Sequence, residues 1–455
     1  MDFYLQHVIR IKKENNMYEN LRTLNMKQYK EKIDFLVNSK LKAIEEGDVD
    51  YNVPIFVWGY PGIGKSKIIA SYCKDTWPKQ THYYSRPWDL TQWAFYNQEM
   101  RNQLIEIGLK NNSKVLMDVR LTLDDSTDLK GFPRYDEKAQ RGMHVRFNSI
   151  LPDPNFPLPI ILLLDELPQA CELVQSAAYS LINDRQVGDY ILPPKCITMA
   201  AGNPAECGGV FNEPPPALKS RFDQIYVDID IPGFLDYMQK QKYDQRILDF
   251  LKYSNMEVGE KEVIYNFSPD KEIFPTFRSW EKVCKKIKYN DNVLNAIIDS
   301  CGQFCAAKYE VYSNVSNLIP NAEELVKGKM YFDDEVKQII ACQKVINNIN
   351  VLANEKNKNL LKLWKNFEYF YYMEKPKDVK NKRDEISVMF IFEIVNNEKL
   401  FDTMAESFKK AYKEKEVDPI IYEEKIEKNK IKDFYMLLFY KWKIIDALSS
   451  SKDEK

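Results

Sequence analysis

The chain has 455 residues, enough for about two to four domains with a large apolar core. Its 65 lysine and arginine residues nearly balance 67 aspartate and glutamate residues, and the net charge of −2 gives no whole-chain argument for nucleic-acid binding. The N-terminus lacks the basic start and apolar core of a signal peptide, and no apolar run approaches the roughly 18–20 residues of a membrane span. The sequence therefore predicts a cytoplasmic protein without a membrane span.

Eight cysteines are scattered along the chain without a C-x-x-C pair. Cys301 and Cys305 lie four residues apart, on one face if this segment is helical. Buried apolar residues in a reducing compartment are the favoured interpretation, and a metal or redox site is the alternative. The chain has only three histidines, which leaves few ligands for zinc.

In chain order, the first regular pattern is a helical period of apolar residues over 26–46, which Gly47 and Asp48 end. Apolar runs then predict strands, and helical stretches such as 172–184 lie between them. The run 160–164 is continuous enough for a strand that is buried on both faces of a parallel sheet. This alternation predicts a three-layer α/β sandwich with ligand-binding residues at the carboxyl ends of its strands. The predicted strands are 55–58, 115–119, 160–164, 196–201 and 224–227.

After about residue 232 the strand signals fade and helical periods dominate. The last hundred or so residues are rich in lysine and glutamate, with apolar stripes over 386–395 and 434–445. Because charges of both signs alternate there, a solvated helical surface is favoured over a nucleic-acid-binding arm.

Residues 59–66 have the G-x-x-x-x-G-K-[ST] spacing of a phosphate-binding loop, between a predicted strand and a predicted helix. Glycines let backbone N–H groups turn onto phosphate oxygens, and the helix N-terminus adds a favourable dipole. Lys65 is expected to reach the β- and γ-phosphates, and the Ser66 hydroxyl is expected to ligate Mg²⁺. The sequence therefore predicts a nucleoside triphosphate site formed by Gly59, Pro61, Gly62, Ile63, Gly64, Lys65, Ser66 and Lys67.

Polar residues follow two of the predicted strands. Asp165 is expected to hold Mg²⁺, through water, and Glu166 is expected to polarise the attacking water. An Asp-Glu pair after a strand is often just a surface strand end, but Lys65 and Ser66 upstream make the catalytic interpretation stronger. Asn203 follows the next strand and is placed to orient the water or to contact the γ-phosphate; a plain Asn-Pro turn is the alternative.

Arg221 lies between a predicted helix and the last predicted strand. An arginine at this place would face the nucleotide of a neighbouring subunit, where it could stabilise charge in the transition state. A surface arginine at a helix end is the alternative.

Together these residues resemble the AAA+ ATPases, and within them the MoxR branch. The segment 118–133 is similar to that branch's D-x-R-L…D-P-T-D-L-x-G-I-P motif, and 165–190 is similar to its Walker B helix and the hairpin that follows. Residues 200–204 fit its sensor 1 segment, and 276–281 are similar to its T-P-R-S-W-E sensor 2 stretch. The resemblance covers roughly residues 50–330.

The resemblance implies an α/β domain, a helical lid and two β-hairpins, near 130–147 and 186–193. The first hairpin has its own signal in the sequence, because 131–135 and 143–147 flank a polar turn. Arg278 is implied to be sensor 2, in contact with the γ-phosphate, although Phe277 replaces the usual proline. The resemblance implies a nucleotide-binding domain 49–231 and a lid 232–330. The helical patterns outside it predict an N-terminal helical segment 1–48 and a C-terminal helical domain 331–455 of unknown role.

One segment, 74–113, is longer than the family leads us to expect. It carries Trp77, Tyr83, Tyr84, Trp88, Trp93, Phe95 and Tyr96. These aromatic side chains suit either the local core of an inserted subdomain or a surface that docks a partner.

The resemblance implies an ATPase that uses ATP and Mg²⁺ in a ring of identical subunits, expected to be a hexamer. MoxR-like ATPases generally remodel or mature other proteins, often with a von Willebrand factor A domain protein. A nucleic-acid motor or a restriction-type, McrB-like subunit is the alternative, and a nucleotide-gated scaffold without catalysis is a third. The choice of ATP over GTP comes from the resemblance alone.

Overall fold

The computed structural model describes residues 21–138, 140–145, 150–256 and 260–321, with single positions at 324, 336, 337, 340, 341 and 344. The chain separates into two compact units. The first comprises the residues up to 244 together with 261–305, and the second comprises 245–260 and the residues from 306 onward. The predicted C-terminal stripes 386–395 and 434–445, and the first 20 residues, lie outside the described part of the chain.

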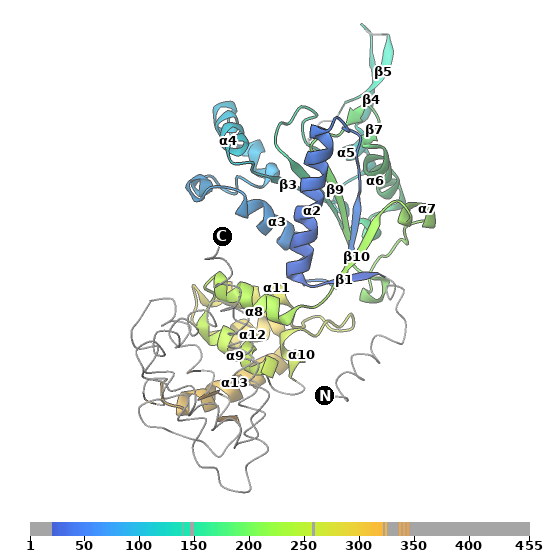
Figure 1. Cartoon of the computed structure of the whole chain (residues 1–455). Coiled ribbons are helices and arrows are strands. Elements are labelled where there is room, and N and C mark those ends of the chain that lie inside the picture. Colours follow the sequence, from blue (N-terminus) through green and yellow to red (C-terminus); the bar gives the residue numbers. More distant parts are fainter. Residues whose placement is uncertain are drawn as a thin grey trace, which may run out of the picture. The chain divides into compact units, whose positions relative to one another are not determined.

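The first unit is built on a six-stranded sheet in which every neighbouring pair is parallel (Figure 1). The five strands predicted from the apolar runs are confirmed. A sixth, β1, was not predicted, because three residues are too few to show a period; it pairs with β10 and buries Leu24. In order across the sheet the strands are β1 (Arg22–Leu24), β10 (Asp223–Val227), β2 (Ile55–Trp58), β9 (Cys196–Gly202), β6 (Ile160–Asp165) and β3 (Val115–Arg120).

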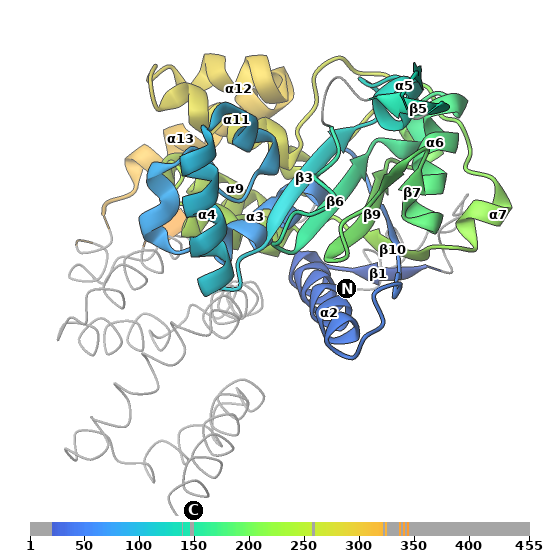
Figure 2. The same cartoon turned by 90° about the horizontal axis from the view of Figure 1, so that it is seen from above.

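Helices cover both faces of this sheet, which gives the predicted three layers (Figure 2). Because strand side chains alternate between faces, Phe56 and Leu162 pack into a core with α6 (Glu172–Asp184) and α4 (Gln98–Lys110). On the opposite face, α3 (Lys65–Asp75) packs against β3 and β6, and α2 (Met26–Glu45) packs against α3 and β9.

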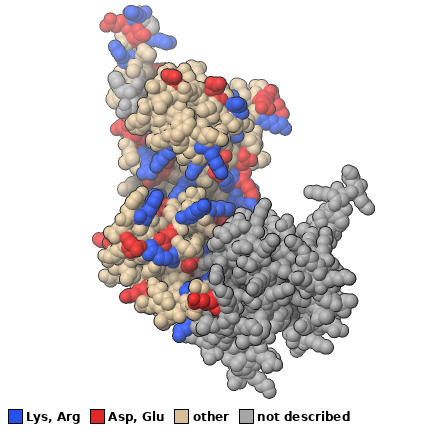
Figure 3. All heavy atoms as spheres, turned by 90° about the vertical axis from the view of Figure 1, so that its left-hand side faces the viewer, with Lys and Arg blue, Asp and Glu red and all other residues tan. Residues whose placement is uncertain are grey.

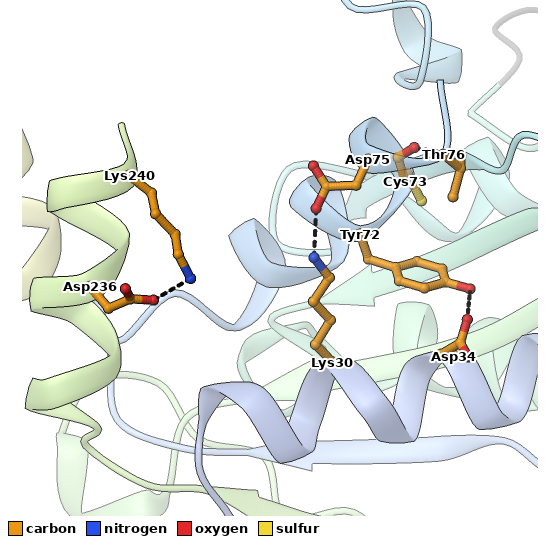
Figure 4. A network of polar contacts seen from close by, with 8 residues as sticks. All are labelled: Lys30, Asp34, Tyr72, Cys73, Asp75, Thr76, Asp236 and Lys240. Carbon is orange, nitrogen blue, oxygen red and sulfur yellow. Dashed lines mark hydrogen bonds and ion pairs between the residues drawn. The ribbon is translucent and has the colours of Figure 1, made fainter. Parts of the chain in front are cut away.

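Helices α2 (Met26–Glu45) and α3 (Lys65–Asp75) are also joined by polar contacts (Figure 4). The Lys30 ammonium lies 2.6 Å from the Asp75 carboxylate, and the Tyr72 hydroxyl donates to Asp34 at 2.9 Å. These contacts fix α2 beside the helix whose N-terminus faces the phosphate-binding loop.

The aromatic segment 74–113 forms the 3₁₀ helices η1 (Lys79–Tyr83) and η2 (Leu90–Phe95), followed by α4. Trp77 and Trp93 are buried against each other in the sheet's own core, and Leu116 of the edge strand β3 donates its N–H to the Trp88 carbonyl at 2.7 Å. These contacts favour the local-core interpretation for Trp77 and Trp93, whereas Tyr83 and Phe95 are exposed. Covering the free edge of β3 also prevents it from pairing with another strand.

Both hairpins that the resemblance implies are present. β4 (Phe132–Asp136) pairs with β5 (Arg141–Val145) after the short helix α5 (Ser126–Lys130), and β7 (Gln186–Val187) pairs with β8 (Tyr190–Ile191). The first hairpin stands away from the sheet in Figure 1. The two are connected, because the His144 N–H donates to Asp189 at 2.7 Å.

The remaining elements of the first unit are short turns and helices. They are η3 (Leu167–Gln169), η4 (Ala205–Cys207), α7 (Pro216–Lys219), α8 (Ile231–Lys240), α10 (Lys261–Ile264), α11 (Phe277–Ile287) and α12 (Val293–Cys301).

None of the helices in the described part of the chain combines the length and apolar character that crossing a bilayer requires.

The second unit contains α9 (Gln245–Met256) and most of α13 (Gln303–Leu318). An aromatic cluster joins them, in which Phe250 packs against Tyr309 and Tyr312. Beside this cluster Lys308 forms an ion pair with Glu260.

Replacing Gly202 with alanine is expected to destabilise the first unit by about 1–3 kcal/mol, because the new Cβ would collide with the Pro168 ring. Chemical unfolding of the two proteins measures this difference. Gly142→Ala is the matched control, since no atom lies within 4 Å of its added Cβ. Equal stability of both variants and the wild type would show that the turn after β6 does not press on the end of β9.

Candidate functional site

The phosphate-binding loop connects β2 to α3, as its spacing predicts, and α3 begins at Lys65. Gly62 has a φ of +77°, a conformation that side chains disfavour, and a Cβ there would lie 3.0 Å from Thr276. The first N–H groups of α3 have no partner within the helix, so the loop offers backbone donors and a positive dipole end to an anion.

Lys65 is buried and its ammonium group has three oxygen partners. It donates to the carbonyls of Gly59 at 2.7 Å and Tyr60 at 3.1 Å, and to the Asn203 side-chain oxygen at 2.9 Å. Burial lowers the pKa of Lys65 to about 8, an effect that the nearby Asp165 carboxylate opposes. The cation is therefore already placed inside the loop where phosphate oxygens would lie.

Ser66 and Asp165 meet directly. The Ser66 hydroxyl donates to the Asp165 carboxylate at 2.6 Å, although 99 residues separate the two in sequence. A hydroxyl and a carboxylate are hard oxygen donors, the kind that Mg²⁺ prefers. The donor set therefore fits Mg²⁺.

Glu166 follows β6 with a φ of +60°, in the left-handed region that non-glycine residues rarely adopt. Its N–H donates to Asp165 at 3.0 Å, and its carboxylate accepts a hydrogen bond from the Thr122 hydroxyl. Such strained backbone is typical of sites where function fixes a side chain. Thr122 was missed from sequence, although it follows a strand that lies next to the Asp165 strand.

Asn203 lies at the end of β9, between the Lys65 and Glu166 strands. Besides accepting from Lys65, it is held through its backbone, because Gln169 donates its side-chain N–H to the Asn203 carbonyl at 3.3 Å. Gly202 allows this approach, since any side chain there would meet Pro168.

Arg278 belongs to the first turn of α11, whose N-cap Thr276 accepts from the Ser279 N–H at 3.1 Å. The helix thus begins at Phe277 even though the usual proline is absent. The side chain of Arg278 is exposed. Thr276, two residues earlier, lies against Gly62, so the first turn of α11 is beside the loop.

Two further contacts connect the loop to residues 261–287. Glu281 of α11 forms an ion pair with Lys67, and the Tyr265 hydroxyl donates to the Pro61 carbonyl at 2.7 Å. Lys67 therefore contacts α11, a role that its position beside Ser66 did not predict.

Arg221 is exposed and lies away from these groups. Asp223, two residues later, pairs with Ile55 at the start of β2, whereas the phosphate-binding loop follows Trp58 at its end. The ends of β2 are about 10 Å apart at the rise of a strand. Arg221 therefore lies at the amino ends of the strands, whereas Lys65 lies at their carboxyl ends.

Asp118 is a further carboxylate that the motifs did not single out as a site residue. It pairs with Leu163, so it shares a face of the sheet with Asp165, and one of its oxygens is buried without a hydrogen-bond partner in the structure. Burial, followed by the charge of Asp165, raises the pKa of Asp118 to about 6. Its orphaned oxygen adds a second hard donor near Asp165.

Comparison with known proteins does not assign the chain to a family. No protein-family model matches the chain, and no curated protein matches it. Similar solved structures include a mutant of RuvB from Thermotoga maritima, with 14% identity, coverage of 69% of this chain and 84% of that chain, and a TM-score of 0.31. NtrX from Brucella abortus in complex with ATP has 14% identity, coverage of 74% and 68%, and a TM-score of 0.28. A DNA replication initiation factor has 14% identity, coverage of 82% and 92%, and a TM-score of 0.23.

The lowered pKa of Lys65 predicts a pH-dependent stability. Between about pH 8 and pH 10.5 the folded state holds Lys65 neutral while the unfolded chain still binds the proton, so the free energy of unfolding rises with pH. The difference in free energy of unfolding between the wild type and Lys65→Met should therefore shift in favour of the wild type across this window. Below pH 7 this difference should be constant. Denaturant unfolding of both proteins against pH measures it, and a difference that does not change with pH would contradict the burial of the ammonium group.

Proposed function

We propose that this chain is a MoxR-type AAA+ ATPase that hydrolyses ATP with Mg²⁺ in a ring of identical subunits and uses the energy to remodel a partner protein. One observation carries the proposal. Five of the predicted site residues lie together at the carboxyl ends of the strands, whereas Arg221 lies at the amino ends. The five are Lys65, Ser66, Asp165, Glu166 and Asn203.

The phosphate-binding loop and the start of α3 would bind the triphosphate, with Lys65 against the β- and γ-phosphates. Ser66, and Asp165 through water, would hold Mg²⁺, which when bound neutralises charge on the phosphate oxygens. Binding would replace the contacts that Lys65 makes with Gly59, Tyr60 and Asn203. Arg278 would reach the γ-phosphate from the first turn of α11.

Glu166 would accept a proton from the attacking water, and Asn203 would orient that water. Both are held by their backbone, Glu166 through Asp165 and Asn203 through Gln169. Positioning of this kind supplies much of the rate enhancement in phosphoryl transfer.

Arg221 would complete the site of the neighbouring subunit. Because it lies across the sheet from its own phosphate-binding loop, it serves catalysis only when another copy brings its nucleotide to that edge. This arrangement requires a head-to-tail interface. Such interfaces form a ring when the rotation between neighbouring subunits closes, and the ring proposed here is a hexamer.

The partner would be a protein client, with a von Willebrand factor A domain protein as the proposed helper. The support is the resemblance, together with the projecting hairpin of β4 and β5, on which Phe132 and Tyr135 are about half exposed. An aromatic and charged hairpin suits contact with a polypeptide.

A nucleic-acid motor is the second candidate, and one observation favours it. On the face shown in Figure 3, lysine and arginine side chains gather across the middle, with acidic side chains among and around them. If DNA or RNA stimulates hydrolysis, with binding that weakens steeply as salt rises, this function replaces client remodelling.

Mixing two inactive variants tests the shared site. Arg221→Ala alone should reduce turnover by about 10³–10⁵-fold, and Glu166→Gln should also be inactive. In an equal mixture, about one quarter of sites combine Glu166 of one variant with Arg221 of the other, so turnover should recover to about a quarter of the wild-type value. Steady-state ATP hydrolysis of each variant and of the mixture measures this. An active Arg221→Ala protein, or a mixture without recovery, would contradict the proposal.

A further inference from the structure

Gln175 is a buried glutamine on α6 whose polar atoms are fully used. The two N–H groups of its side-chain amide are shared among three carbonyls, those of Leu167 at 3.1 Å, Ala170 at 3.2 Å and Asn212 at 3.1 Å. Its oxygen accepts from the Tyr179 hydroxyl at 2.7 Å. Only 3% of the residue is exposed, so these bonds form away from water, where losing one is costly.

Asn212 reaches the same turn from the other side. Its backbone N–H donates to the Pro168 carbonyl at 2.8 Å, and its side-chain amide donates to the Ala170 carbonyl at 2.7 Å. The turn 167–170 follows Glu166 directly, and the Gln169 N–H donates back to the Glu166 carbonyl at 3.0 Å. Asn212 and Gln175 therefore fix the turn that sets the strained backbone of Glu166.

The segment from Asn212 to Arg221 is short and stiff. Residues 214–216 are three consecutive prolines, each with a fixed φ. Lys219 lies 2.5 Å from the Glu213 carboxylate, its N–H donates to the Pro215 carbonyl at 3.1 Å, and its own carbonyl accepts from Gln224 of β10 at 3.0 Å. A displacement at Asn212 would therefore be carried to Arg221, nine positions later.

We propose that Gln175 and Asn212 are positioning residues that join the turn after Glu166 to the segment that carries Arg221. The positions of Glu166 and Arg221 within one subunit are thereby coupled, although Arg221 acts in the site of the neighbouring subunit. This inference rests on the proposed shared site. The change to make is Asn212→Ala, because Asn212 is less buried than Gln175 and its backbone bond to Pro168 remains.

The experiment places Asn212→Ala on one side of the shared site at a time. In the mixture of Glu166→Gln and Arg221→Ala, the first variant supplies the arginine and the second supplies the glutamate. Asn212→Ala is added to the first variant in one mixture and to the second in another. ATP turnover in both should fall by about 10- to 100-fold relative to the parent mixture, since small displacements of reacting groups have effects of this size.

A fall in only one mixture, or in neither, overturns the proposal. Asn38→Ala is the matched control, because it also removes one asparagine hydrogen bond, to Asp34 on α2, and it should leave turnover unchanged. In the otherwise wild-type protein, Asn212→Ala should lower kcat with little change in KM, whereas general unfolding would lower the melting temperature and the active fraction. If the parent mixture is inactive while the wild type is active, the shared site itself fails, and that result does not involve Asn212.

Discussion

All strands of the main sheet run parallel, so their carboxyl ends meet at one edge, and the order of strands decides which side chains meet there. β9 lies between β2 and β6, so Asn203 can contact Lys65 from one neighbouring strand and the Gln169 turn from the other. Because Arg221 precedes β10, the same strand direction places it at the amino ends of the strands. The shared direction of the strands therefore brings most of the candidate site residues together and leaves Arg221 apart from them.

Three features of the candidate site lower the stability of the fold, and the surrounding core must compensate for them. Lys65 is buried, Asp118 has an orphaned oxygen, and Glu166 has a left-handed backbone. Each of these lowers stability. Buried hydrogen bonds from Gln175 and Asn212 hold the turn in place, which is how a strained residue can persist.

Sequence patterns predicted the parts of the fold that have strong periods or motifs. Helix α6 has the predicted bounds 172–184, and the phosphate-binding loop lies between strand and helix as its spacing requires. The rest depends on contacts between distant residues. Three-residue β1 is a strand only because β10 pairs with it, and nothing local shows that Thr122 would meet Glu166.

In the proposed function, a complete hydrolytic site needs two copies of the chain. Its most direct test is the specific activity of the wild-type protein with ATP and GTP as its concentration rises, with assembly followed by sedimentation in the same samples. The monomer should hydrolyse little ATP, and specific activity should rise in step with the assembled fraction. Equal specific activity at all concentrations, from a protein that sediments as a monomer, would show a self-contained site and contradict a site shared between subunits.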